Sequence, residues 1–172
     1  MSQNRLLGLH WGIKGSFMDY IAAMPDSRAT AIDGATPTSS DVLVFEPAIP
    51  TPPKPEDADL LLGFRGDVRF SGHAGLLFVR IADPWITVHR GRGVLTILDP
   101  YQPDEKPRLP LAHLTLVPQP ASDGMRIWLG QDVRLTDEGT GLFNDVYPAG
   151  EPMEPLAVFL PQTSPLDDIA QG

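Results

Sequence analysis

The chain has 172 residues, 42% of them hydrophobic, which is enough for one domain with a sizeable core. Its 22 acidic and 13 basic residues give a net charge of −9, which argues against a nucleic-acid partner and against attachment to anionic membranes. There is no cysteine, so disulfides, zinc–thiolate sites and iron–sulfur clusters are excluded. With no long apolar run and no signal-like start, we expect no membrane insertion and a cytoplasmic location; a trimmed chain would instead be extracellular.

A short helix is predicted near the N-terminus, over residues 11–21. At about 100° per residue, Tyr20 falls on the same face as Ile13 and Phe17, so we expect the helix to carry Tyr20 on its buried face. Pro25 ends this helical pattern, because proline disfavours helical geometry in the residue before it. Taken alone, Tyr20 is typical of a core aromatic residue whose hydroxyl finds one partner.

Short strands separated by turns are predicted along the rest of the chain, which has 19 prolines and 16 glycines. The apolar pattern predicts strands over 41–45, 67–70, 75–81, 85–89, 94–98, 111–117, 125–135 and 155–160. No helical crossovers are evident of the kind that parallel strands need. We therefore expect a mainly β fold of twisted antiparallel sheets, sandwich or barrel-like, with one or two short helices. We expect one domain over residues 1–172, with its core at about 6–160 and a flexible tail at 161–172.

The motif Ser71-Gly72-His73-Ala74-Gly75 lies between two predicted strands. Its glycines allow the backbone to approach a neighbour closely or to adopt unusual dihedral angles. Taken alone, His73 fits a turn or core histidine. The other histidines, His10, His89 and His113, have no metal-ligand spacing, and the sequence has no phosphate-binding glycine loop, dinucleotide fingerprint or nucleophile elbow.

Three blocks of sequence together resemble the haem-transport-associated (HtaA) domain family. The first is Trp11-Gly12-Ile13-Lys14 with Ser16-Phe17 and Tyr20-Ile21. The second runs from Gly66 to Leu76 and on to Ile81-Ala82-Asp83-Pro84. The third comprises Trp128, Leu135-Thr136, Tyr147-Pro148-Ala149-Gly150 and Pro155-Leu156. The blocks follow the family's order over roughly residues 6–160, and the family binds haem in mostly actinobacterial uptake systems on a β-rich fold with short helices.

This resemblance implies a haem b site in which Tyr20 is the axial ligand of the haem iron. It implies that His73 supports Tyr20 by hydrogen bonding and that Tyr147 contributes to the haem pocket. Ferric iron suits an anionic oxygen ligand, and tyrosinate is a known haem ligand. Because a free phenol ionises near pH 10, the iron charge and a hydrogen bond from a second-shell histidine would have to help it ionise. The candidate apolar walls are Phe17, Ile13, Phe70 and Leu76, and the candidate partners of the haem propionates are Arg65, Arg69 and Arg80.

Several functions remain open at this stage. The first is a non-enzymatic protein that carries, buffers or transfers haem, with another haem carrier as partner, and it requires Tyr20 and His73 to converge across an open slot. The second is a structural or interaction domain that has lost haem, with a filled slot or with the two side chains apart. The third is a peroxidase-like or haem-degrading enzyme, which needs a polar distal residue such as His89 or His113. The last is the binding of some other small apolar ligand.

Overall fold

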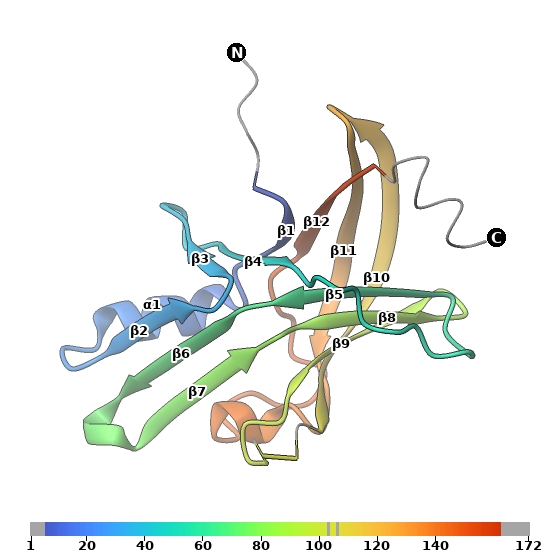
Figure 1. Cartoon of the computed structure of the whole chain (residues 1–172). Coiled ribbons are helices and arrows are strands. Elements are labelled where there is room, and N and C mark those ends of the chain that lie inside the picture. Colours follow the sequence, from blue (N-terminus) through green and yellow to red (C-terminus); the bar gives the residue numbers. More distant parts are fainter. Residues whose placement is uncertain (1–5, 103, 106, 163–172) are drawn as a thin grey trace.

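Two antiparallel sheets make up most of the protein, seen here in a computed structural model that describes residues 6–102, 104–105 and 107–162 (Figure 1). The strands of the large sheet are, in spatial order, β1 (Gly8–Trp11), β12 (Leu156–Pro161), β11 (Met125–Leu135), β10 (Arg108–Ser122), β9 (Arg92–Leu98), β8 (Trp85–His89), β5 (Leu60–Arg65), β4 (Leu43–Pro47) and β3 (Ala35–Pro37). The small sheet consists of β2 (Arg28–Ile32), β6 (Asp67–Gly72) and β7 (Leu77–Ala82). The helical elements are α1 (Gly15–Ala23) and the short 3-10 turns η1 (His73–Gly75) and η2 (Thr140–Phe143).

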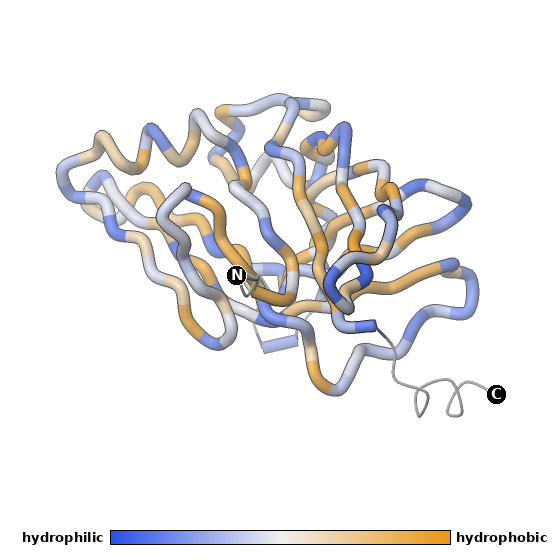
Figure 2. Tube along the Cα trace, turned by 90° about the horizontal axis from the view of Figure 1, so that it is seen from above, coloured by the Kyte–Doolittle hydropathy of each residue, from blue (hydrophilic) through white to orange (hydrophobic). Residues whose placement is uncertain are grey.

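The large sheet closes on itself, because β1 pairs with β12 on one side and with β4 on the other. Eight of its strands therefore form a ring, and β3 is attached to the ring only through β4. This arrangement confirms the mainly β antiparallel prediction and selects the barrel-like alternative. Hydrophobic stretches follow the strands while hydrophilic residues gather at many of the turns (Figure 2), and Trp11, Phe45 and Phe64 are fully buried.

The small sheet continues from the large one, because β5 leads directly into β6 and β7 leads directly into β8 (Figure 1). The chain bends at both of these connections. At the bend, the Gly66 amide donates a hydrogen bond of 3.0 Å to Oδ1 of Asp83, and the Asp83 amide donates one of 2.8 Å to the Gly66 carbonyl oxygen. A Cβ atom on Gly66 would lie 2.8 Å from the Cβ of Ala35, so only glycine fits there. The bend directs the β6–β7 hairpin toward α1.

The N-terminal helix is shorter than predicted. Trp11 belongs to β1 instead, and its indole N–H donates to the Glu154 carbonyl oxygen at 2.8 Å. The helix begins at Gly15, whose N–H donates to the Glu154 carboxylate at 3.0 Å, so a residue far along the chain caps it. The prediction of a buried Tyr20 is wrong: the helix buries Phe17 and Ile21, whereas Tyr20 lies at the edge of this face and is 49% exposed.

All the predicted strands are present, and β8 and β11 have the predicted bounds. Four strands were not predicted: β1 and β5, together with β2, in which four of five residues are exposed and give no apolar alternation, and β3, which has only three residues. It began β10 too late, since Pro110 lies inside the strand beside a break in register. Of the predicted tail, residues 163–172 lie outside the described residues. Within the described part of the chain, no helix is both long and apolar enough to cross a membrane.

Candidate functional site

A largely apolar cavity of about 590 Å³ lies between α1, the tip of the β6–β7 hairpin and the segment that contains η2. Its lining side chains are Ser16, Phe17 and Tyr20 from α1, His73, Leu76 and Leu77 from the hairpin, and Phe143, Asn144, Val146 and Tyr147 from η2 and the loop after it. Its volume falls within the roughly 300–1,000 Å³ typical of small-molecule sites. Three segments that are distant in sequence therefore share one ligand-sized space.

Phe17 forms a buried apolar wall of the cavity. It is 3% exposed, and its ring makes edge-to-face contacts with Phe70 and Phe143 at centroid distances of 5.3 and 5.2 Å. Phe70 is almost fully buried and lies behind Phe17, outside the lining of the cavity. The predicted wall residue Ile13 is also fully buried and outside the lining, whereas Leu76 belongs to it and is 85% exposed.

Tyr20 and His73 meet at this cavity. The Tyr20 hydroxyl and Nε2 of His73 form a hydrogen bond, and the two ring centroids are 5.8 Å apart. Tyr20 lies one helical turn after Ser16, so both side chains lie on the cavity side of α1. Tyr20 is thus a half-exposed residue that lines an apolar space and whose hydroxyl is hydrogen-bonded to His73.

His73 is presented by a hairpin tip with unusual backbone geometry. His73 and Ala74 both have positive φ angles, of 50° and 54°, which non-glycine residues seldom adopt. The carboxylate of Asp26, just after α1, accepts hydrogen bonds from both amides, at 3.3 Å from His73 and 2.8 Å from Ala74. The hydrogen bond from Ala74 is the largest cause that holds the pKa of Asp26 below its usual value; burial acts against it, and the hydrogen bond from His73 adds to the lowering. Sequence analysis missed Asp26, for which the only local signal is its place after Pro25 at the end of the helix.

Tyr147 lines the cavity from the loop after η2. Its hydroxyl is 3.5 Å from Oγ of Ser16, and its ring packs against Phe143 at a centroid distance of 5.6 Å. Nζ of Lys14 lies 4.9 Å from the centre of the Tyr147 ring, within reach of a cation–π interaction. Glu151 forms an ion pair with that ammonium group at 3.1 Å. The Tyr147 ring is therefore contacted both by Phe143 and by a lysine that is itself held in place.

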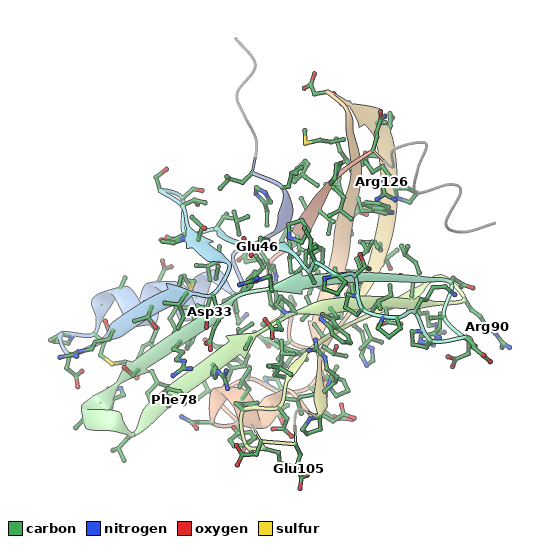
Figure 3. The ribbon with its side chains drawn as sticks, viewed as in Figure 1. Asp33, Glu46, Phe78, Arg90, Glu105 and Arg126 are labelled. Carbon is green, nitrogen blue, oxygen red and sulfur yellow. The ribbon has the colours of Figure 1, made fainter. Side chains whose placement is uncertain are left out.

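The three arginines expected near the propionates lie outside the cavity lining and are paired with carboxylates. Arg65 pairs at 2.8 Å with Glu46, which is labelled in Figure 3. Arg69 and Arg80 both pair with Asp67, at 3.0 and 2.9 Å. Burial by itself would raise the pKa of Asp67, but the hydrogen bonds from the two arginines outweigh it and hold that pKa below its usual value.

The remaining histidines, His10, His89 and His113, also lie outside the cavity lining. Over the described residues, no group of three or more His, Cys, Asp or Glu side chains is arranged to hold a metal ion. The chemistry that the cavity offers is therefore an apolar surface with a phenol oxygen and an imidazole nitrogen at one side and a second phenol at another.

Comparison with known proteins gives one family match and several similar folds. The HtaA family model (described as Htaa) matches residues 7–159. The fold is similar to the N-terminal domain of HtaA from Corynebacterium glutamicum, with a TM-score of 0.71, 20% identity and coverage of 93% of this chain and 100% of that one. It is similar to the C-terminal domain of the same protein, with a TM-score of 0.66, 21% identity and coverage of 89% and 96%.

A third similar structure is the heme binding protein HtaB from the same organism, with a TM-score of 0.66, 17% identity and coverage of 89% of this chain and 91% of that one. At these identities, the structural likeness shows the fold. A search of curated proteins finds no match.

Proposed function

The chain belongs to the HtaA family, and on that premise we propose that it binds haem b in the cavity beside Tyr20. The observation that carries the proposal is the hydrogen bond between the Tyr20 hydroxyl and His73 at the edge of an apolar, ligand-sized space. Because Tyr20 is half-exposed and lies outside the core, its hydroxyl could bind a metal in a bound macrocycle without displacing core residues. The cavity chemistry fits haem, which needs a flat apolar slot and an axial ligand for its iron.

In this proposal Tyr20 supplies a phenolate oxygen to ferric iron, and His73 donates a hydrogen bond to that oxygen. Haem supplies the iron charge that favours the ionised phenol, and tyrosinate is a known haem ligand. The His73 N–H fixes the orientation of the phenolate, as second-shell donors do at metal sites. The hairpin tip that carries His73 would thereby help to hold the iron ligand that the helix carries.

The apolar walls and the second tyrosine would hold the macrocycle. Phe17 and Phe143 are buried aromatic residues that line the cavity, and Tyr147 lines it as well. Phe70 would act through Phe17, which it supports from behind. Because Arg69 and Arg80 are engaged by Asp67, we propose that the propionates face solvent at the mouth of the cavity.

We further propose that the protein carries, buffers or transfers haem without enzymatic turnover, with another haem-carrying protein as the partner. The site offers an iron ligand and apolar walls, and His89 and His113 lie outside its lining. The alternative is a domain that keeps the fold without the ligand, and the experiment below separates the two.

The test is a haemin titration of the purified protein followed by absorbance, run beside Tyr20→Phe and Tyr101→Phe. Tyr101 is a matched control because it is exposed and hydrogen-bonded to the Gly141 carbonyl oxygen, outside the cavity lining. We expect a saturable one-to-one Soret shift with a tyrosinate charge-transfer band in the wild type and in Tyr101→Phe. Tyr20→Phe should lose that band. It should also bind haemin at least ~10-fold more weakly, because loss of a group that only hydrogen-bonds a metal ligand already costs ~10–100-fold in affinity. Weak, non-saturating spectra that are the same in all three proteins would overturn the proposal in favour of the alternative.

A further inference from the structure

Two contacts fasten the end of α1 to the hairpin tip that bears His73. Met24, the residue after the helix, packs so closely on Gly72 that a Cβ there would lie 2.0 Å from the methionine sulfur. Two residues later, Asp26 binds the amides of His73 and Ala74. Met24 and Asp26, which follow the helix that carries Tyr20, therefore hold it against the turn that carries His73.

The contact made by Asp26 differs from an ordinary surface hydrogen bond. Its two carboxylate oxygens each accept from one of two successive backbone N–H groups, an arrangement in which the backbone forms a concave anion site. Both donors belong to residues in the left-handed region, a strained conformation that costs free energy for a non-glycine residue. A charged acceptor makes stronger hydrogen bonds than a neutral one, so the carboxylate can offset part of that cost.

The geometry of this turn sets where the imidazole points. His73 contributes both the amide that Asp26 holds and the side chain that meets the Tyr20 hydroxyl. The side chain is exposed, so neighbouring core residues do little to fix it. Asp26 holds the backbone of this turn, which sets the position from which the imidazole extends toward Tyr20.

We propose that Asp26 is a positioning residue for the iron ligand: by holding the hairpin tip, it keeps His73 hydrogen-bonded to Tyr20. This inference rests on the proposed function, since it assigns Asp26 a part in haem binding without contact with haem. Asp26 is outside the cavity lining, so it would act only through His73.

The first test is a double-mutant cycle on haemin affinity with Asp26→Ala, His73→Asn and the double variant. Asparagine replaces His73 because it tolerates positive φ and therefore removes the imidazole with little added strain. We expect each single change to weaken haemin binding about 10-fold, as for other second-shell partners, and the double variant to be within about twofold of the weaker single variant. Asp19→Asn removes the same charge from the exposed face of α1 next to Tyr20 and should leave the affinity unchanged. Wild-type affinity in Asp26→Ala, or effects that multiply in the double variant, would overturn the inference.

The second test needs no haem. In the NMR spectrum of the free protein, Tyr20→Phe should shift the His73 ring signals strongly in the wild-type background and only weakly in the Asp26→Ala background. Equal shifts in both backgrounds would overturn the positioning role. If wild-type protein fails to bind haemin, the proposed function fails and this test alone decides the role of Asp26. Should Asp26→Ala not fold by circular dichroism, Asp26→Asn, which keeps one acceptor oxygen, replaces it in both tests.

Discussion

The hydroxyl of Tyr20 is hydrogen-bonded to Nε2 of His73, although the two residues are 53 positions apart in the chain. One comes from a nine-residue helix and the other from a three-residue 3-10 turn. The contact forms because the bend at Gly66 and Asp83 carries the β6–β7 hairpin away from the large sheet toward α1. The site thus depends on this bend, although Gly66 and Asp83 lie outside the cavity lining.

Tyr147→Phe should weaken haemin binding by less than Tyr20→Phe does. The change removes only a hydroxyl whose partner, Oγ of Ser16, is at the long limit of 3.5 Å, and it keeps the ring against Phe143. We expect stability to change by no more than about 1 kcal/mol. Haemin titration and urea denaturation measure the two quantities. Loss of the charge-transfer band in this variant would show that Tyr147, rather than Tyr20, binds the iron.

Phe17→Ala should destabilise the protein by about 3–5 kcal/mol, because a buried ring with two aromatic neighbours is replaced by a cavity. Leu76→Ala is the control, because Leu76 lines the same cavity but is 85% exposed. The free energy of unfolding of this variant should stay within about 0.5 kcal/mol of the wild-type value. Urea denaturation of the three proteins checks both values. Similar stability in all three would mean that Phe17 is not part of the core.

Asp67→Asn should lower stability at neutral pH and have little effect in acid. The pKa of Asp67 lies below its ordinary value of 3.8, so its ion pairs contribute stability above that value and lose it as the pH falls through the lowered pKa. At pH 7 we expect a loss of about 1–3 kcal/mol, since two arginines lose a charged hydrogen-bond partner. Denaturant midpoints of both proteins at pH 7 and near pH 2 provide the measurement. A difference that stays constant between the two pH values would contradict this assignment.

Gly66→Ala should destabilise the protein by about 3 kcal/mol or more. The new Cβ would lie 2.8 Å from the Cβ of Ala35 and 2.9 Å from the Phe45 ring, and the residue would keep a φ of 148°. Gly91→Ala is a matched control, because Gly91 also has a positive φ, of 80°, but a Cβ there meets open space. It should cost only about 1–2 kcal/mol of strain. Thermal denaturation compares the two, and equal losses would mean that the bend tolerates a side chain.

Local patterns in the sequence determined the antiparallel β class and most of the strands. Alternating apolar residues over 85–89 and 125–135 carry this information within a few positions, because successive side chains of a strand point to opposite faces of the sheet. The same kind of pattern misplaced the start of the helix, since Glu154 and the burial of Trp11 decide where α1 begins. It also placed Tyr20 on the buried face, because a helical period says which side chains share a face but not where the edge of the packed surface lies.

For the candidate site too, the sequence identifies some residues and the tertiary structure decides how they are arranged. Tyr20, His73, Tyr147 and Phe17 could be selected from sequence, because their blocks follow the order of a known family. Only the tertiary structure places these four around one cavity, puts Phe70 behind its wall and brings Asp26 to the hairpin tip. A hydrogen bond between distant segments depends on how the sheets bend and pack. No local pattern records that geometry, because each segment is compatible with many relative positions until the core fixes one.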